Sequence, residues 1–436
     1  MASIIIFLSV LYFMRMKLIV VLLIIYGFLI VIDLYTYKGL RSLIHPKTAV
    51  RNLNIVFWFI SVLVYGAIAW QFIDPPKQRV PGAFNSIYLT AFLILCVYIP
   101  KFIFIIFHVA DDLLHFINRA IVFFQSFRRK KELKNIQQEN KISRYKFLSQ
   151  TGLFIAAIPI LPMINGFIKG RFNFTIYKQK LVFKQLPKEF SGYKIVQLSD
   201  IHIGSFYGNE KEIERAFEMV NAQNPDLIVF TGDLVNNYTE ETRGWEHIFS
   251  KLKAKDGIIS ILGNHDYGDY YTWPSKKAQI DDHHALLEFQ KQVGFNLLLN
   301  EHVCVNRQQS NIVIAGVENW GLPPFRQSGD LEKALKNTSE NDFIILLTHD
   351  PSHWDEQVIG KKNIYLSLSG HTHGMQFGFK WKNFEWSPAS WKYPRWAGLY
   401  QAKNQFLYVN RGLGFIGMPA RVGMNPEITV IELYNE

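Results

Sequence analysis

Cysteine is scarce in this chain of 436 residues, which contains only Cys96 and Cys304. One lies in an apolar stretch and the other far downstream, so a disulfide between them is not expected. The sequence therefore does not indicate a disulfide framework, and two cysteines say little about the redox compartment.

Acidic residues are scarce in the first part of the chain, and basic residues show no surplus in the second. Residues 1–170 hold 19 of the 47 Lys and Arg and 6 of the 36 Asp and Glu, a net charge of +13. This leaves 28 basic and 30 acidic residues in 171–436, a net charge of −2. A nucleic-acid-binding surface needs a basic surplus on the globular part, so no nucleic acid partner is expected.

Apolar residues, in contrast, are abundant: 49% of the chain is hydrophobic and 15% is aromatic. Four runs approach the length of about 20 residues that a membrane-spanning helix needs. They are 18–32, 53–70, 84–109 and 147–168. Met14 or Met16 would make a tidier start for the first helix than Met1. Lys101 lies within the third run and is expected to snorkel or to face a pore, with a transport role as the alternative.

The basic excess lies in the loops of this apolar part and orients the spans. Four basic residues follow the first run, and nine lie between Arg119 and Lys146, before the fourth. The loop between the second and third runs has only Lys77 and Arg79. Because basic loops face the cytoplasm, everything after the fourth span is expected outside. We therefore expect a multi-pass protein of the cell (inner) membrane with an extracytoplasmic catalytic domain.

From about residue 171 onward, short apolar runs alternate with polar and helical segments, which is typical of a soluble α/β domain. A helix with an amphipathic pattern is expected at 209–223. The expected strands are 194–199, 227–230, 258–262, 311–316, 343–347, 364–369, 406–409 and 428–433. The sequence thus predicts a membrane region with about four transmembrane helices at 1–170 and a globular domain at 171–436.

Five of the expected strands end in polar clusters. These are DIH with Asp200 and His202, GD with Asp233, GNHD with Asn264, His265 and Asp266, THD with His349, and GHTH with His371 and His373. Parallel sheets bind ligands beyond the carboxyl ends of their strands, so the five ends are expected to converge on one crevice. Carboxylates, an amide and imidazoles together suit divalent Mn, Fe or Zn better than Ca or Mg.

Glycines directly precede three of these side chains, at Gly232, Gly263 and Gly370. The chain has to leave a strand sharply at these points, where a Cβ atom would obstruct the path.

The ordered set D-x-H, GD, GNHD, H and GHxH resembles the calcineurin-like metallophosphoesterases, over about residues 194–433. The later segments LSGHTHGMQFG and VNRGLGFIGMPARVGMNPEITVIEL are similar to the membrane-anchored bacterial branch of that superfamily. The resemblance implies a two-sheet α/β sandwich that follows the N-terminal transmembrane helices, and a metal-dependent phosphohydrolase activity.

The resemblance also implies roles for the residues at the strand ends. Two divalent ions, about 3.5–4 Å apart, would polarise a phosphoryl group and acidify the attacking water. The first would be held by Asp200, His202 and His373, the second by Asn264, His349 and His371, with Asp233 bridging them. His265 would either donate a proton to the leaving group or stabilise its charge, and Asp266 would orient His265.

Two positions depart from the pattern of that branch. Met375 stands where relatives tend to have a second glycine after GHTHG, which is expected to alter substrate access. SRYKFL at 143–148 is similar to a twin-arginine export signal, but Tyr145 replaces the second arginine. Basic residues flanking a span are the simpler interpretation.

The DDHH motif at 281–284 is expected to be a solvated helix start, because acidic residues are favoured in the first turn of a helix. A cap over the site or a further metal site is the alternative.

The segment 379–396 interleaves four tryptophans with Lys380, Lys382, Lys392 and Arg395. Two interpretations stay open: a loop at the membrane interface, or a loop whose tryptophans pack on the sheet edge. Base stacking on single-stranded nucleic acid is a weaker third, because the domain is net acidic.

The sequence therefore predicts a membrane-anchored phosphoesterase that hydrolyses a phosphomonoester or phosphodiester with two Mn, Fe or Zn ions. A phospholipid or an envelope lipid precursor is the candidate substrate. Two alternatives remain open. One is a UDP-diacylglucosamine-type pyrophosphatase that faces the cytoplasm, and the other is a non-catalytic, metal-bound membrane sensor or transporter.

Overall fold

A computed structural model of the protein describes residues 2–73, 82–128, 144–382 and 384–436. The chain divides into two compact units. The first combines residues 1–75 with 90–164, and the second combines residues 76–89 with 165–436. The second unit contains all of the described strands.

The first unit is helical. Its helices are α1 (Ala2–Leu43), α2 (Lys47–Ile73), α3 (Asn85–Arg128) from residue 90 onward, α4 (Arg144–Ala157) and the first part of α5 (Ile160–Ile168). Four segments are long and apolar enough to cross a membrane: 19–43, 47–73, 85–124 and 146–168. The prediction of four apolar N-terminal helices is confirmed. Lys77, Arg79 and the part of the basic segment at 129–143 lie outside the described residues.

A buried ion pair joins three of these helices. The Lys101 ammonium donates to Asp33 Oδ1 at 2.6 Å and to Ser61 Oγ at 3.0 Å. Asp33 is fully buried, and Lys101 is 8% exposed. The interpretation of Lys101 as a snorkelling side chain is therefore wrong, because its ammonium is paired within the bundle. Pairing is the usual state of a charge at membrane depth and requires no transport role.

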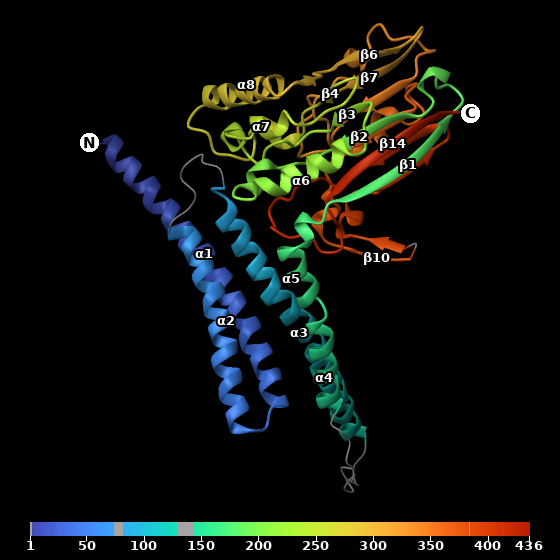
Figure 1. Ribbon diagram of the computed structural model, residues 1–436. Coiled ribbons are helices and arrows are strands. Elements are labelled where there is room, and N and C mark those ends of the chain that lie inside the picture. Colours follow the sequence, from blue (N-terminus) through green and yellow to red (C-terminus); the bar gives the residue numbers. More distant parts are fainter. Residues whose placement is uncertain (1, 74–81, 129–143, 383) are drawn as a thin grey trace. The chain divides into compact units, whose positions relative to one another are not determined.

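The second unit is a sandwich of two six-stranded sheets (Figure 1). The first sheet has the order β1-β14-β2-β3-β4-β5, and the second has the order β12-β13-β9-β8-β7-β6. Most neighbours are parallel, whereas β14 with β2, β6 with β7 and β12 with β13 are antiparallel. A separate two-stranded hairpin, β10–β11, follows β9 in the chain.

The strands of the first sheet are β1 (Thr175–Phe183), β2 (Tyr193–Leu198), β3 (Leu227–Phe230), β4 (Ile258–Ser260), β5 (Phe295–Leu297) and β14 (Glu427–Asn435). Those of the second sheet are β6 (Glu301–Arg307), β7 (Ser310–Gly316), β8 (Ile344–Leu347), β9 (Leu366–Ser369), β12 (Gly398–Ala402) and β13 (Gln405–Val409). The hairpin consists of β10 (Phe379–Trp381) and β11 (Phe384–Trp386).

Helices cover the outer face of the first sheet. They are α6 (Glu210–Asn221), α7 (Glu246–Phe249) and α8 (Lys276–Gln292) (Figure 1). The short α9 (Leu331–Ala334) packs against the second sheet. One apolar core lies between the sheets and contains Ile195, Val229, Ile314 and Leu368. A second core lies under α6 to α8. The predicted two-sheet α/β sandwich is confirmed.

The central strands were predictable because both of their faces are covered. β3, β8 and β9 are buried at every position, and such strands appear in the sequence as continuous apolar runs. The four edge strands, β1, β5, β6 and β12, were all missed. Most of their positions are exposed or half-exposed, so only pairing with the neighbouring strands defines them as strands.

Candidate metal centre

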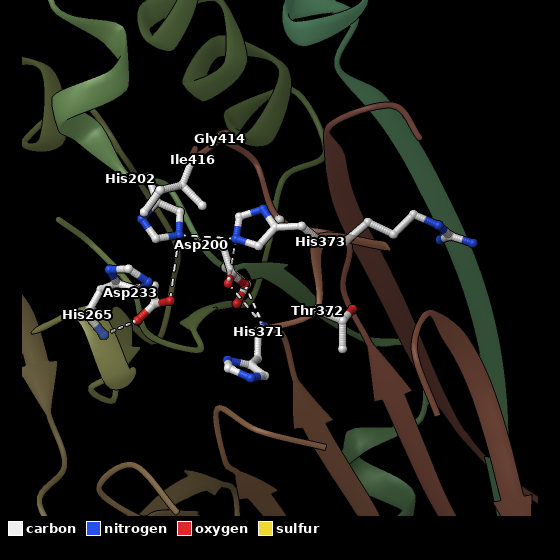
Figure 2. A network of polar contacts seen from close by, with 12 residues as sticks. Asp200, His202, Asp233, His265, His371, Thr372, His373, Gly414 and Ile416 are labelled. Atoms are coloured by element: carbon white, nitrogen blue, oxygen red, sulfur yellow. Dashed lines mark hydrogen bonds and ion pairs between the residues drawn. The ribbon is translucent and has the colours of Figure 1, made fainter. Parts of the chain in front are cut away.

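The structure brings the five polar strand ends together in one place. β2, β3 and β4 of the first sheet supply Asp200, His202, Asp233, Asn264, His265 and Asp266, and β8 and β9 of the second sheet supply His349, His371 and His373. The site therefore lies at the carboxyl ends of strands from both sheets, where the chain leaves each strand (Figure 2). Its side chains come from five separate turns.

The backbone of these turns is unusual. Asp200, His202, Asp233, His371 and His373 all have positive φ values, between 47° and 73°. Such conformations cost free energy for residues with a Cβ atom and cluster at functional sites, where the surrounding fold imposes them. Five left-handed residues in one site indicate that the fold orients these side chains for a purpose other than stability.

Two glycines before these residues are required by close approach of the backbone. A Cβ atom at Gly263 would lie 2.2 Å from Asp233 Oδ1, and one at Gly370 would lie 2.0 Å from Ser199 Oγ and 2.2 Å from Asp200 Oδ2. Any larger residue would displace a carboxylate of the site.

One group of candidate ligands consists of Asp200, His202 and His373, whose ligand atoms lie within 4.8 Å of one another. His373 Nε2 lies 3.2 Å from Asp200 Oδ1 and 3.1 Å from His202 Nε2. All three side chains are buried.

A second group consists of Asp233, His349 and His371, also within 4.8 Å. Asn264 completes it: its Oδ1 lies 2.8 Å from His371 Nδ1 and 3.1 Å from His349 Nε2. The amide oxygen thus faces the same point as the two imidazoles, which is the arrangement of a neutral ligand.

Asp233 lies between the two groups. Its Oδ2 is 3.2 Å from His349 Nε2. The same oxygen is 3.6 Å from His202 Nε2 (Figure 2). One carboxylate therefore contacts an imidazole from each group, and this is the geometry that a bridging ligand needs.

Main-chain carbonyls set the tautomers of three histidines. The Nδ1 atoms of His202, His349 and His265 lie 3.1, 2.7 and 2.6 Å from the carbonyl oxygens of Val235, Thr231 and Asn236. A carbonyl oxygen only accepts, so each Nδ1 carries the proton. Each Nε2 is then the nitrogen that faces the site, and in the neutral ring it presents a lone pair there, as the ligands of metal centres do.

His373 is held differently. Arg421 donates from Nη2 to its Nδ1 at 3.2 Å and to the Arg411 carbonyl oxygen at 2.9 Å. A guanidinium only donates, so the ring proton of His373 lies on Nε2, beside Asp200.

The electrostatics of the site favour bound cations. Asp200 and Asp233 are almost completely buried, and no Lys or Arg of the described residues forms a salt bridge with either. Burial lowers the pKa of His349, but Asp233 and Asp200 outweigh it and raise that pKa to about 10. In the absence of an ion the carboxylates therefore retain a proton on His349, which binding at Nε2 displaces. Two buried carboxylates, imidazoles and an amide fit two divalent ions.

His265 lies beside both groups without belonging to either. Its ring contacts the ring of His202 at a centroid distance of 4.9 Å, and its backbone N–H donates to Asp233 Oδ1 at 2.8 Å. The Asn236 carbonyl orients the imidazole so that Nε2 is free to exchange a proton with a bound molecule.

Asp266 does not orient His265, so that prediction is corrected. Its carboxylate accepts four backbone N–H groups, those of Gly263 and Asp233 at 2.9 Å, Leu234 at 2.8 Å and Val235 at 3.3 Å. Burial and the neighbouring Asp233 carboxylate raise the pKa of Asp266, and the amides of Gly263 and Leu234 oppose this. Asp266 therefore holds the two turns that carry Asp233 and Asn264 against each other.

Several residues that support the site were not singled out from the sequence. Tyr393 Oη lies 2.8 Å from His371 Nε2, and Tyr270 Oη accepts from Asn264 Nδ2 at 2.8 Å. Asp350, whose Oδ2 is 3.4 Å from His371 Nε2, directly follows His349 in the THD motif. Its position in that motif was an available signal. The two tyrosines are far from the motifs in sequence, and only the fold brings them here.

The DDHH segment is not a solvated helix start. It lies inside α8, whose N-cap is Ser275, and it is partly buried. Asp282 accepts from the Thr239 backbone N–H at 3.0 Å, and His283 Nδ1 donates to the Asp266 carbonyl oxygen at 3.0 Å. The segment therefore fastens α8 to the loops around the site.

A buried carboxyl group supports the loop that orients His265. Glu241 is 3% exposed and accepts the backbone N–H groups of Asn236 at 2.6 Å and Asn237 at 3.2 Å. Burial raises the pKa of Glu241 from 4.5 to about 8, against these hydrogen bonds. Between these pH values the native state binds more protons than the unfolded state. The contribution of Glu241 to stability is thus fully present below pH 4.5 and is lost as the pH rises through 8.

We expect Glu241→Gln to weaken this pH dependence, because the amide stays neutral. The unfolding midpoint of the full chain in detergent, measured between pH 6 and pH 9, should fall less for the variant than for the parent. The exposed Glu218→Gln serves as the control. Equal pH dependence for all three proteins would contradict this role of Glu241.

Comparison with known proteins identifies the family. Residues 193–375 match the family described as "Calcineurin-like phosphoesterase", and residues 14–171 match "Probable Calcineurin-like phosphoesterase, transmembrane domain". The chain belongs to the calcineurin-like metallophosphoesterases and is a membrane-associated member of that family.

Individual relatives agree with this assignment. The chain is 33% identical over 251 residues to "Uncharacterized metallophosphoesterase YkuE" of Bacillus subtilis (strain 168), covering 57% of this chain and 81% of that protein. It is 27% identical over 417 residues to an "Uncharacterized metallophosphoesterase" of Helicobacter pylori (strain ATCC 700392 / 26695), covering 93% and 97%. A "Transmembrane protein with metallophosphoesterase domain" of Danio rerio is 33% identical over 258 residues, which cover 57% of this chain and 55% of that protein.

Proposed function

We propose that this protein is a membrane-anchored dimetal phosphoesterase that hydrolyses a phosphomonoester or a phosphodiester. The observation that carries the proposal is the position of Asp233 between two sets of buried candidate ligands, with His265 beside both. Membership of the metallophosphoesterase family supports the same reaction class.

The proposed ligand sets follow the geometry of the site. Asp200, His202 and His373 hold one divalent ion. Asn264, His349 and His371 hold the other, and Asp233 contacts both. The donor set suits Mn, Fe or Zn.

The ions, when bound, supply Lewis acidity toward the phosphoryl oxygens and the attacking water. His265 performs the proton transfer. In its protonated form His265 carries a proton on each ring nitrogen. The attacking water loses a proton to solvent, its oxygen forms a new bond to phosphorus as the bond to the leaving oxygen breaks, and the Nε2 proton of the His265 imidazolium moves to that leaving oxygen. The Asn236 carbonyl keeps the His265 ring in position. Asp266 holds the turns that carry Asp233 and Asn264 against each other through its backbone hydrogen bonds. Asp266 is therefore a positioning residue in this proposal.

The proposed substrate is a phosphate ester carried by a membrane lipid or an envelope lipid precursor. Two features support it: the four candidate spans, and an exposed aromatic and basic hairpin that follows the GHTH motif in the chain. The chain spans about half the length of the Danio rerio relative, and nothing in that relative's name specifies a substrate.

We further propose that the catalytic domain, residues 171–436, lies outside the cytoplasm and that residues 1–170 form the membrane region in the cell (inner) membrane. The segment before α3 supports the membrane topology. The Phe84 ring contacts the Tyr238 ring at 6.4 Å, within the second compact unit. Two candidate spans separate these residues, so an even number of crossings returns the chain to the same side.

No observation favours the alternatives that the sequence left open. A pyrophosphatase that faces the cytoplasm requires the opposite orientation, and cysteine accessibility mapping of the C-terminal domain in intact cells separates the two. A sensor or transporter was suggested by Lys101, whose charge is paired with Asp33.

The test is hydrolysis by the purified full chain. After removal of metal with a chelator, turnover of bis-p-nitrophenyl phosphate or p-nitrophenyl phosphate is expected to disappear and to return with Mn, Fe or Zn. The ratio of the two rates reports the class of ester. Hydrolysis that persists at undiminished rate in the stripped protein would contradict a dimetal mechanism.

A further inference from the structure

The β10–β11 hairpin has one aromatic face. The pairs Phe379 with Trp386 and Trp381 with Phe384 lie directly opposite each other, and all four side chains share that face. Lys380 pairs with Glu385 on the other face. The hairpin is therefore amphipathic, although its strands have only three residues each.

The aromatic face is exposed. Trp381 is 72% exposed, Phe384 56% and Phe379 49%, and the nearby Trp391 is 79% exposed. The sequence-based alternative, in which the tryptophans pack on the sheet edge, is therefore wrong for Trp381 and Trp391. Contiguous apolar patches of this kind mark interaction surfaces.

An ion pair holds the hairpin in place. Arg411 donates to Glu385 Oε1 at 2.8 Å and to Glu427 Oε2 at 2.7 Å, so it joins β11 to the first sheet through a buried guanidinium. Trp386 also contacts Trp391 at a ring centroid distance of 5.7 Å. The ion pair thus attaches the aromatic hairpin to the sandwich, and Trp391 extends the aromatic surface beyond the hairpin.

The hairpin begins close to the end of the fourth candidate span. The last residues of that span, 165–168, belong to the same compact unit as the sheets. Arg421 N–H donates to the Gly166 carbonyl oxygen at 3.2 Å, and Gly378 N–H donates to the Val422 carbonyl oxygen at 2.9 Å. β10 begins at Phe379, directly after Gly378. Because Arg421 and Val422 are adjacent and bond to Gly166 and Gly378, the start of β10 lies close to the end of the span.

The same segment continues into the wall of the metal centre. The chain runs from β11 through Trp391 to Tyr393, whose hydroxyl contacts His371. Thr372 Oγ1 donates to the carbonyl oxygen of Trp396, and Ser387 Oγ donates to that of Gly374. A surface that lies against the hairpin therefore lies beside the loop that carries His371 and His373.

We propose that the hairpin surface, made of Phe379, Trp381, Phe384 and Trp391 with Lys382, inserts into the interface of an anionic lipid bilayer. The aromatic rings occupy the headgroup level, and Lys382, whose ammonium lies 5.8 Å from the centroid of the Trp381 ring, attracts anionic headgroups. The end of the adjacent span places this surface at the height of the interface. Insertion follows from the exposure of the hairpin and its place beside the span. That the site takes its phosphate ester from the bilayer surface rests in addition on the proposed phosphoesterase function.

Lipid quenching of a fluorescent label tests the insertion directly. The full chain, with Cys96→Ala and Cys304→Ser, receives one new cysteine as Trp381→Cys or Trp391→Cys and is labelled with bimane. It is placed in phosphatidylglycerol nanodiscs with or without a doxyl group on the upper acyl chain. A label buried about 5–10 Å into the interface is expected to lose about half of its emission or more.

Val182→Cys is the matched control. Val182 is 54% exposed and lies on β1, about 23 Å along the strand from Thr175 at roughly 3.3 Å per residue. Its label is expected to keep its emission. Unfolding midpoints of the labelled proteins show whether each is folded. Equal emission from positions 381 and 182 in doxyl nanodiscs would overturn the proposal.

Two further experiments distinguish lipid insertion from self-association and from failure of the proposed function. A second copy of the chain is the competing occupant; cross-linking between two copies at position 381 without lipid quenching would overturn insertion in its favour. For Phe384→Ala with Trp381→Ala, the ratio of turnover on a vesicle-borne phosphate ester to turnover on p-nitrophenyl phosphate is expected to fall. No turnover on either ester would reject the proposed function and leave the quenching result standing.

Discussion

Asp233→Asn is expected to lower metal-dependent phosphoester hydrolysis by more than about 100-fold. Even a residue that only supports a metal ligand typically contributes 10- to 100-fold to affinity or activity. Asp233 contacts an imidazole of each candidate group, so its loss affects both ions at once. The amide of Asn has the same shape, but it lacks the negative charge and can offer only one oxygen.

The measurement combines the rate of bis-p-nitrophenyl phosphate hydrolysis with metal content by plasma mass spectrometry. The bound metal is expected to fall below two ions per chain. Asp281→Asn, at an exposed position of α8, provides a control for the loss of one carboxylate. Retention of two ions and of the rate by Asp233→Asn would reject the bridging role.

His265→Ala is expected to lower turnover by about 100- to 10,000-fold on esters with a poor leaving group, the usual contribution of a general acid. The loss should be much smaller for p-nitrophenyl esters, because p-nitrophenolate leaves without a proton. Metal content should stay at the parental value, since His265 lies beside the candidate ligands and not among them.

This dependence on the leaving group distinguishes proton donation from a structural role. A misfolded site would lose activity equally on both kinds of ester. His284→Ala, at an exposed position, controls for the removal of a histidine. A uniform loss on all esters, or a loss of metal, would mean that His265 is a ligand or a structural residue.

The convergence of the candidate site could be predicted from the sequence because each motif follows a strand that is buried on both faces. Asp200 and Asp233 come within three residues of the ends of β2 and β3, and the fold places the ends of these neighbouring parallel strands side by side. The resemblance then supplied a role for each position. The hydrogen-bond partners of Asp266 could not be derived in this way. Its neighbour in sequence is His265, but its carboxylate accepts the backbone N–H groups of Asp233 and Gly263.

The side chains that hold the candidate ligands in place could not be predicted from local sequence patterns either. Arg421 is distant in sequence from His373, and Tyr393 lies beyond a hairpin from His371, yet each contacts its histidine. Hydrogen bonds between side chains so far apart depend on how the loops close. Neither periodicity nor motif spacing contains that information.

By itself, the sequence determined the apolar helices, the alternation of strands and helices, and the polar residues at five strand ends. These features depend on composition and on neighbours within a few positions, through burial of apolar runs and the period of each element. Tertiary structure alone decided which imidazole nitrogens face the site, which carboxylate lies between the two groups, and that the tryptophans of the hairpin are exposed. Those properties depend on contacts between segments far apart in the chain, since only the folded backbone brings a carbonyl, a guanidinium or a sheet edge next to them.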